Sequence, residues 1–231
     1  MSLNNEIREL LKQEGCNIVG FADIRSLPEE ARRNFNYGIV MALPFTKEAI
    51  MENRNGLPKR YSDEHGPMTQ KLSDLKKIIA DFIVNKGYEA LSDTPASEID
   101  NSTLRAPLSQ KAVATLAGIG WIGKCAMLVT KEVGSALRLT VILTNAPLDC
   151  GTPITKSLCG PGCNSCVDIC PGNASKGILW EVGIDRDDFF DAHACRAAAR
   201  ARAKSLLDIE ATLCGLCIVN CPYTKRGLGY K

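Results

Sequence analysis

Cysteine is the residue type in this chain with the clearest potential for chemistry. The 231-residue sequence holds eleven cysteines, and eight of them lie in the segment from Cys159 to Cys221. Thiolates are nucleophiles and soft metal ligands, so this concentration predicts a metal or redox centre. Disulfides are the alternative. The first residues lack the basic stretch and apolar run of a secretory signal, so we expect a cytoplasmic, reducing setting in which disulfides are rare.

The order of these cysteines favours iron–sulfur clusters. The first run reads Cys-xxx-Cys-xx-Cys-xxx-Cys-Pro from Cys159 to Pro171, and the second ends Cys-xx-Cys-xxx-Cys-Pro at Pro222. This ending is typical of bacterial ferredoxins, in which three cysteines hold one 4Fe-4S cluster and the fourth reaches across to the other cluster. Zinc is the weaker alternative, because structural zinc sites usually use two separated Cys-xx-Cys pairs.

The number of cysteines in the segment matches two clusters. Two 4Fe-4S clusters need eight thiolates, and the segment supplies eight. By the crossing rule, one cluster takes Cys159, Cys163, Cys166 and Cys221. The other takes Cys170, Cys195, Cys214 and Cys217.

Four cysteines lie outside the regular spacing of the two runs. Cys195 supplies the ligand that Ala211 cannot, which requires a helix over residues 196–213 to carry the chain out and back. Cys150 is a reserve ligand. Cys16 and Cys125 stand alone in apolar surroundings, where a buried thiol is a small hydrophobe, and we expect no role for them.

Composition limits the class of protein. The chain is 45% hydrophobic and 23% charged, which is typical of a globular protein, and its net charge of +2 gives no argument for a polyanion partner. The stretches without a charged side chain, such as the 12 residues 112–123 and the 14 residues 211–224, are short, because a membrane-spanning helix needs about 20. We therefore expect no membrane association.

The first two-thirds of the chain predict an α+β domain over residues 1–150, followed by a cluster module over residues 151–231. Helices are expected from Leu3 to Gly15 and from Pro67 to Gly87. Strands are expected at 17–23 and at 37–43, the second buried on both faces. Two more strands, 126–130 and 137–144, flank a Gly-Ser pair and are expected to form a hairpin.

A glycine-rich loop precedes this hairpin. It reads Ala-Gly-Ile-Gly-Trp-Ile-Gly-Lys over residues 117–124. Its glycines permit either a tight turn or a close approach of the backbone to a ligand. Trp121 would either stack on a flat ring or fill the core.

The loop and the cysteine runs together resemble a known family. Residues 110–124, Gly134-Ser135 and both runs follow the order found in epoxyqueuosine reductases and in corrinoid reductive dehalogenases. The resemblance implies a nitroreductase-like α+β domain that binds cobalamin, followed by a ferredoxin-like module with two 4Fe-4S clusters, in a cobalamin-dependent reductase. It also implies that the loop lines the corrin pocket, through Gly118, Gly120, Trp121, Ile122, Gly123 and Lys124.

The resemblance also bears on activity and partners. The aspartate that relatives use as a proton donor falls at Leu104, with Asp93 or Asp100 as substitutes, so the catalytic residue is left unassigned. Because the sequence stops ten residues after Cys221, without the family's helical-repeat extension, we expect tRNA to be an unlikely partner. The expected partners are an electron donor such as a ferredoxin or flavodoxin, and a small-molecule substrate or a corrinoid protein. The alternatives are an electron-transfer or corrinoid-activating protein with no substrate of its own, and a flavin-binding reductase.

Overall fold

The computed structural model of the chain describes residues 1–56 and 58–230, which form two compact units. Unit 1 comprises Met1–Leu43, Met68–Gly120 and Arg138–Ile154, and unit 2 comprises Pro44–Pro67, Trp121–Leu137 and Thr155–Lys231. The predicted division into residues 1–150 and 151–231 stays a prediction. Unit 2 contains the cysteine runs and also draws on two segments from earlier in the chain.

A four-stranded sheet forms the centre of unit 1, in the order β1-β2-β6-β3. The strands are β1 (Ile18–Asp23), β2 (Tyr37–Pro44), β6 (Leu137–Thr144) and β3 (Ala90–Leu91). β1 pairs with β2 in antiparallel register from Ile18↔Ala42 to Asp23↔Tyr37, and β3 pairs antiparallel with β6. The predicted strands at 17–23 and 37–43 are confirmed.

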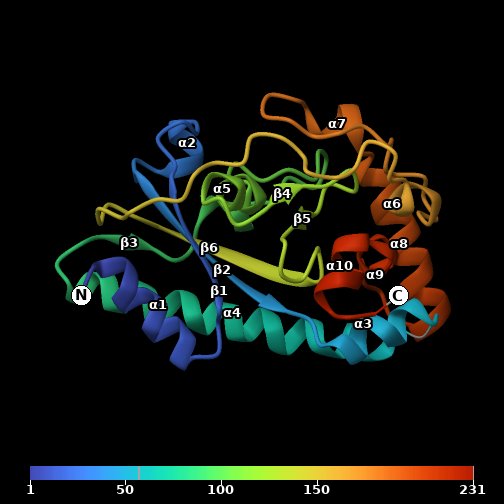
Figure 1. The fold of residues 1–231 in the computed structure, drawn as a ribbon, viewed down its shortest axis with the longest axis horizontal. Helices are drawn as coiled ribbons and strands as arrows, with labels where there is room; N and C mark the ends of the chain where they lie inside the picture. Colours follow the sequence, from blue (N-terminus) through green and yellow to red (C-terminus); the bar gives the residue numbers. More distant parts are fainter. Residues whose placement is uncertain (57, 231) are drawn as a thin grey trace. The chain divides into compact units, whose positions relative to one another are not determined.

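The side chains of β1 and β2 alternate between two buried faces, because successive residues of a strand point to opposite sides. Val19, Phe21, Ile39 and Met41 lie in the main hydrophobic core, and that core also contains residues of α1 (Leu3–Gln13) and α4 (Lys59–Asn85). Figure 1 shows α1 and α4 running side by side along one side of the strands. We therefore assign this face to the two helices.

Glycines occupy the other face of the same strands and let α5 (Gln110–Leu116) approach closely. A Cβ built on Gly38 would lie 2.7 Å from the Val113 side chain, and one built on Gly20 would lie 2.8 Å from the side chain of Ala117. Contacts this short exclude any larger side chain. The prediction that residues 37–43 form a strand buried on both faces is confirmed.

Unit 2 is made mainly of short helices. They are α3 (Lys47–Arg54), the first turns of α4, α6 (Ser165–Asp168), α7 (Arg186–Phe189), α8 (Ala192–Leu207), α9 (Leu216–Asn220) and α10 (Pro222–Gly227). A two-stranded antiparallel hairpin, β4 (Trp121–Ile122) with β5 (Leu128–Val129), completes the unit. The helix predicted over residues 196–213 is present as α8, but it begins before Cys195 and ends at Leu207.

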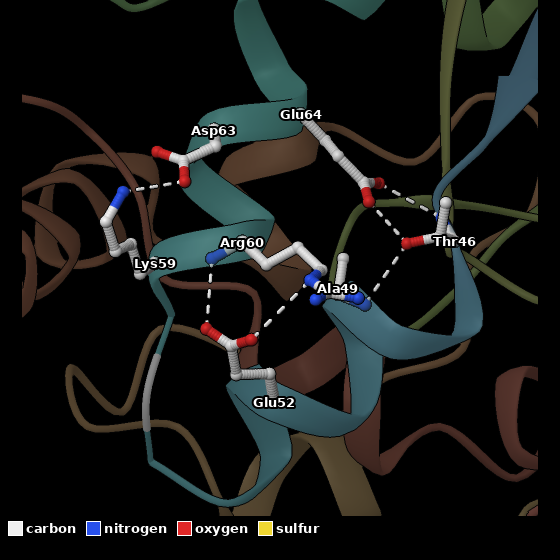
Figure 2. A network of polar contacts seen from close by, with 7 residues as sticks. All are labelled: Thr46, Ala49, Glu52, Lys59, Arg60, Asp63 and Glu64. Atoms are coloured by element: carbon white, nitrogen blue, oxygen red, sulfur yellow. Dashed lines mark hydrogen bonds and ion pairs between the residues drawn. The ribbon is translucent and has the colours of Figure 1, made fainter.

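Polar contacts join α3 to the start of α4 (Figure 2). The Thr46 hydroxyl caps α3 by accepting from the Ala49 N–H at 3.2 Å, and it donates to Glu64, whose carboxylate also accepts from the Thr46 N–H at 3.0 Å. Glu52 of α3 accepts from the backbone N–H of Arg60 at 3.1 Å. These bonds fix the part of α3 that carries Asn53.

Two sequence expectations differ from the structure. α4 begins at Lys59 rather than at Pro67, which lies inside the helix. Residues 126–130 and 137–144 do not form a hairpin with each other, because β5 pairs with β4 and β6 joins the main sheet. Among the residues that the structure describes, no helix combines the length and apolar character required to cross a bilayer.

Candidate iron–sulfur site

Six cysteines line a single cavity of about 270 Å³ within unit 2. Five come from the two cysteine runs, and one follows the glycine-rich loop directly: Cys125, Cys159, Cys163, Cys166, Cys217 and Cys221. The thiols surround the cavity rather than converge on a point. In the described part of the chain, no three Cys, His, Asp or Glu side chains meet closely enough to hold a single metal ion.

Cysteines of both runs lie near one another, and Cys159 and Cys221 line the same cavity. Burial raises the pKa of Cys221 in the second run, and the nearby Cys159 of the first run raises it further. Burial likewise raises the pKa of Cys214 in the second run, and Cys170 of the first run adds to this increase. Each pair therefore lies close enough to interact electrostatically. Each also combines residues predicted to hold the same cluster.

Local backbone geometry places the second run. Gly215 has φ +74°, a left-handed conformation that favours glycine, and it directly precedes α9, which carries Cys217. A Cβ at this position would lie 2.6 Å from the Asn53 side-chain nitrogen and 2.9 Å from the Tyr61 ring. Cys221 ends α9, and Pro222 then begins α10, where its fixed φ suits the first helical position.

Asn53 connects α3 to this run. Its side chain is fully buried, its Nδ2 donates to the Cys214 carbonyl at 2.9 Å, and its Oδ1 accepts from Nη2 of Arg202 in α8 at 3.0 Å. The Arg202 guanidinium also lies near enough to Cys214 to lower its pKa, against the larger effect of burial. A fixed cation therefore stands beside one predicted cluster ligand.

The predicted ligands of the second cluster are only partly brought together. Cys170 accepts a hydrogen bond from the Ala174 N–H at 3.3 Å and lies near Cys214, as described above. Cys195 lies in the first turn of α8 and is half-buried. Cys217 faces the cavity that the first set lines.

The glycine-rich loop forms one wall of the cysteine cavity. Gly123 and Lys124 line it, and the Lys124 ammonium, only 3% exposed, donates to the carbonyls of Pro161 and Cys163 at 2.9 and 3.0 Å. A buried ammonium at this position stabilises negative charge on neighbouring thiolates. The two carbonyls satisfy two of its three N–H donors and hold the loop against the first run.

Trp121 points toward a cysteine. Its Nε1–H donates to Sγ of Cys159 at 3.5 Å, and its ring meets Tyr223 edge to face at 4.7 Å. The Trp121 side chain is 1% exposed and packs in the interior of unit 2, and its stacking on a flat ring stays a prediction.

The remaining loop residues lie in regular or tight backbone. Ile122 is in β4, whereas Gly118 and Gly120 belong to unit 1. Gly118 has φ +71°, and a Cβ there would lie 2.5 Å from the Thr152 carbonyl oxygen. The assignment of the six loop residues to a corrin pocket stays a prediction.

Three cysteines lie outside the predicted ligand sets. Cys16 is fully buried in the core of unit 1, as expected of a small hydrophobe. Cys150, the reserve ligand, also belongs to unit 1, where it packs against the same core and its thiol donates to the Leu148 carbonyl at 3.4 Å. Cys125 lines the cavity among the predicted ligands, although the sequence assigned it no role.

Asp100 is one of the two aspartates that the resemblance offers as a proton donor in place of Leu104. Its carboxylate accepts from the Ser102 hydroxyl at 2.8 Å and N–H at 2.7 Å, and from the Thr103 hydroxyl at 3.0 Å. These bonds, those of Ser102 foremost, lower the pKa of Asp100. It therefore stays ionised at neutral pH and has no proton to give.

The chain was compared with known proteins. No protein-family model matches it. Epoxyqueuosine reductases are similar in sequence: that of Listeria monocytogenes is 30% identical over 74% of this chain and 42% of its own length. That of Atelocyanobacterium thalassa is 31% identical over 75% of this chain and 53% of its own length. The chain spans about half the length of the curated relatives it matches.

Solved structures share the fold. An epoxyqueuosine reductase bound to an epoxyqueuosine-modified stem loop of tRNA-Tyr matches 96% of this chain and 65% of its own, with a TM-score of 0.61 and 23% identity. A catabolic reductive dehalogenase in complex with 3-bromo-4-hydroxybenzoic acid matches 96% of this chain and 32% of its own, with a TM-score of 0.66 and 18% identity.

These matches define the class of protein. The chain is a mixed α/β protein with the fold shared by epoxyqueuosine reductases and reductive dehalogenases. Within that class, the chain is a homologue of the epoxyqueuosine reductases, which confirms the resemblance drawn from its motifs.

One expectation about partners is wrong. The sequence led us to regard tRNA as an unlikely partner, yet a protein of this fold is known in complex with a tRNA stem loop. We based this expectation on where the sequence stops, and that position carries no information about what the protein binds.

Proposed function

We propose that this chain is an iron–sulfur oxidoreductase whose unit 2 holds two 4Fe-4S clusters and supplies single electrons to a corrinoid. The observation that carries the proposal is that all four cysteines of the first ligand set line one cavity, three from the first run and Cys221 from the second. Crossed ligation between two runs, as in two-cluster ferredoxins, requires this grouping. The proposed ligand sets are those given by the spacing: Cys159, Cys163, Cys166 and Cys221, and Cys170, Cys195, Cys214 and Cys217.

The chain's own residues suit this chemistry. Bound clusters would store and release single electrons. The cysteines hold the irons, and a thiol whose pKa is raised by burial, such as that of Cys221, gives up its proton when a metal binds. The Lys124 ammonium and the Trp121 indole N–H both stand at the first ligand set and stabilise negative charge there.

Metal analysis tests the cluster proposal. The full chain is reconstituted anaerobically with iron and sulfide, desalted, and analysed for iron, sulfide, zinc and cobalt. We expect about eight irons and eight sulfides per chain, and after dithionite reduction a paramagnetic resonance signal from two interacting clusters. Tightly bound zinc without iron, or cystines in the anaerobic protein, would refute the proposal.

The corrinoid part of the proposal draws on the relatives. A solved reductive dehalogenase of this fold is described with a mechanism for B12-dependent dehalogenation, and the glycine-rich loop is the candidate contact, through Gly118, Gly120, Trp121, Ile122, Gly123 and Lys124. An absorption titration of the reconstituted protein with cobalamin tests it. Saturable binding at micromolar protein supports the corrinoid, whereas an isolated protein with a flavin spectrum would support the flavin-binding alternative.

For the substrate, we propose an epoxyqueuosine-bearing tRNA stem loop as the first candidate, because the sequence relatives are epoxyqueuosine reductases. The second candidate is an electron-transfer or corrinoid-activating protein with no substrate of its own. It is favoured by Leu104 at the proton-donor position and by the low pKa of Asp100.

Turnover separates these candidates. Protein reduced through a ferredoxin or flavodoxin is incubated with the modified stem loop, and the nucleosides are analysed after digestion. Loss of the epoxide oxygen supports the reductase. Electron delivery to a corrinoid protein, with the stem loop unchanged, supports the carrier.

A further inference from the structure

The feature that carries a further inference is Cys125, which lines the cysteine cavity although it is not one of the eight predicted ligands. Two clusters account for eight thiolates, and Cys125 belongs to neither set. It nevertheless lines the same cavity as Cys159, Cys163 and Cys166. Cys217 of the second run lines this cavity as well.

The surroundings of Cys125 differ from those of a structural thiol. Cys16 shows the contrast within the same chain: it lies among aliphatic side chains of unit 1, and its thiol donates to the Ala42 carbonyl at 3.5 Å. Cys125 instead lines a cavity together with five other cysteines. A side chain that only filled space would not need sulfur at this position.

The backbone holds Cys125 in place. The hairpin β4–β5 turns over residues 123–127, where the Gly123 N–H donates to the Met127 carbonyl and the Ala126 N–H to the Gly123 carbonyl, both at 2.9 Å. Ala126 has φ +57°, which sharpens the turn at the residue after Cys125. The Lys124 ammonium also ties the turn to the first cysteine run through two carbonyls.

A further contact links this turn to Cys166. The Ser175 hydroxyl donates to the Lys124 carbonyl at 2.8 Å and lies 3.9 Å from Sγ of Cys166. Ser175 is buried, so it holds the turn and the Cys166 thiol side by side. Cys125 and Cys166 therefore face the same corner of the cavity from two fixed segments.

We propose that Cys125 is an alternative ligand that can bind the cluster iron assigned to Cys166. In this exchange one iron–sulfur bond to Cys166 breaks and one to Cys125 forms, the Cys125 proton passes to the released Cys166 thiolate, and no electron moves. The inference rests on the proposed two-cluster function. It adds that one corner of the first cluster has two candidate thiolates.

Alanine variants test this directly. Cys166→Ala, Cys159→Ala, Cys125→Ala and the double variant Cys125→Ala/Cys166→Ala are reconstituted anaerobically and desalted to remove small thiols. We expect Cys166→Ala and Cys125→Ala to keep the wild-type iron content and show no three-iron signal in the resonance spectrum. Cys159→Ala, the matched control from the same ligand set, and the double variant are expected to lose up to half of the iron or to show the three-iron signal.

The outcomes separate the two proposals. Wild-type protein without iron would refute the proposed function itself. Suppose that the wild-type protein holds both clusters and that Cys166→Ala loses as much iron as Cys159→Ala. This result would overturn only the proposal that Cys125 is an alternative ligand. If Cys166→Ala does not fold, Cys166→Ser replaces it. A resonance spectrum that matches wild type in Cys166→Ser and changes in Cys125→Ser/Cys166→Ser supports the proposal, and a spectrum already changed in the single variant overturns it.

Discussion

Asn53 gives the sharpest prediction about what holds unit 2 together. Its fully buried amide donates to the Cys214 carbonyl at 2.9 Å and accepts from the Arg202 guanidinium at 3.0 Å. Asn53→Ala removes both bonds and leaves a carbonyl and a charged donor without their partner. A buried polar group that loses its hydrogen-bond partner destabilises the fold by about 1–3 kcal/mol, and hydrogen bonds to charged groups contribute about 1.5–3 kcal/mol. Because Cys214 is only half-buried, we expect a loss of about 2–4 kcal/mol in the free energy of unfolding.

Tryptophan fluorescence measures this loss in the right part of the chain. The chain has two tryptophans, Trp121 and Trp180, and both belong to unit 2. Urea unfolding followed by this signal gives the shift in midpoint and, with the slope, the change in free energy. Asn55→Ala is the matched control, because Asn55 follows the same helix α3 and is exposed, and we expect a change within about 0.5 kcal/mol. A change as small as this in Asn53→Ala would refute the reasoning.

Three further predictions concern other contacts in unit 2. Trp121→Phe keeps a ring but removes the N–H that donates to Cys159. This hydrogen bond stabilises the more negative, reduced state of the proposed cluster, so we expect its loss to lower one midpoint potential in a redox titration. An unchanged potential would contradict this prediction. Gly134→Ala would place a Cβ 2.2 Å from a backbone nitrogen at φ +60°, so we expect more than about 1 kcal/mol of destabilisation in urea. Its control Gly162→Ala, with open space around it, should be close to neutral. Burial raises the pKa of Tyr230 to about 12 from an ordinary value of 10.0. The free energy of unfolding of the wild type should therefore fall relative to that of Tyr230→Phe as pH rises from 10 to 12. Parallel pH profiles of the two proteins would contradict this prediction.

The sequence predicted the features that chemistry or strict periodicity imposes. Cluster ligation requires fixed cysteine spacing, and Cys159 and Cys221, which the spacing assigns to one cluster, line the same cavity. The strand at residues 37–43 followed from an apolar run without charges, and both of its faces are buried. The α+β class followed from these elements.

The errors arose where distant contacts decide the outcome. Residues 126–130 and 137–144 both have strand character, but Gly134 between them lies against the backbone of Thr224 in the C-terminal segment, and β6 joins the main sheet. Pro67 is typical of a helix start, yet the chain is already helical from Lys59. Cys125 was missed because its position depends on the turn at Ala126, whose left-handed backbone is not signalled by an alanine.

The composite make-up of unit 2 has a consequence for the order in which the protein matures. The walls of the cysteine cavity include Lys124 and Cys125 as well as Tyr223 and Arg226, and Asn53 holds Cys214 from still earlier in the chain. The chain must therefore be synthesised at least as far as Arg226 before the walls of the cavity are complete. Residues 155–231 synthesised alone would lack that scaffold and would be a poor independent ferredoxin.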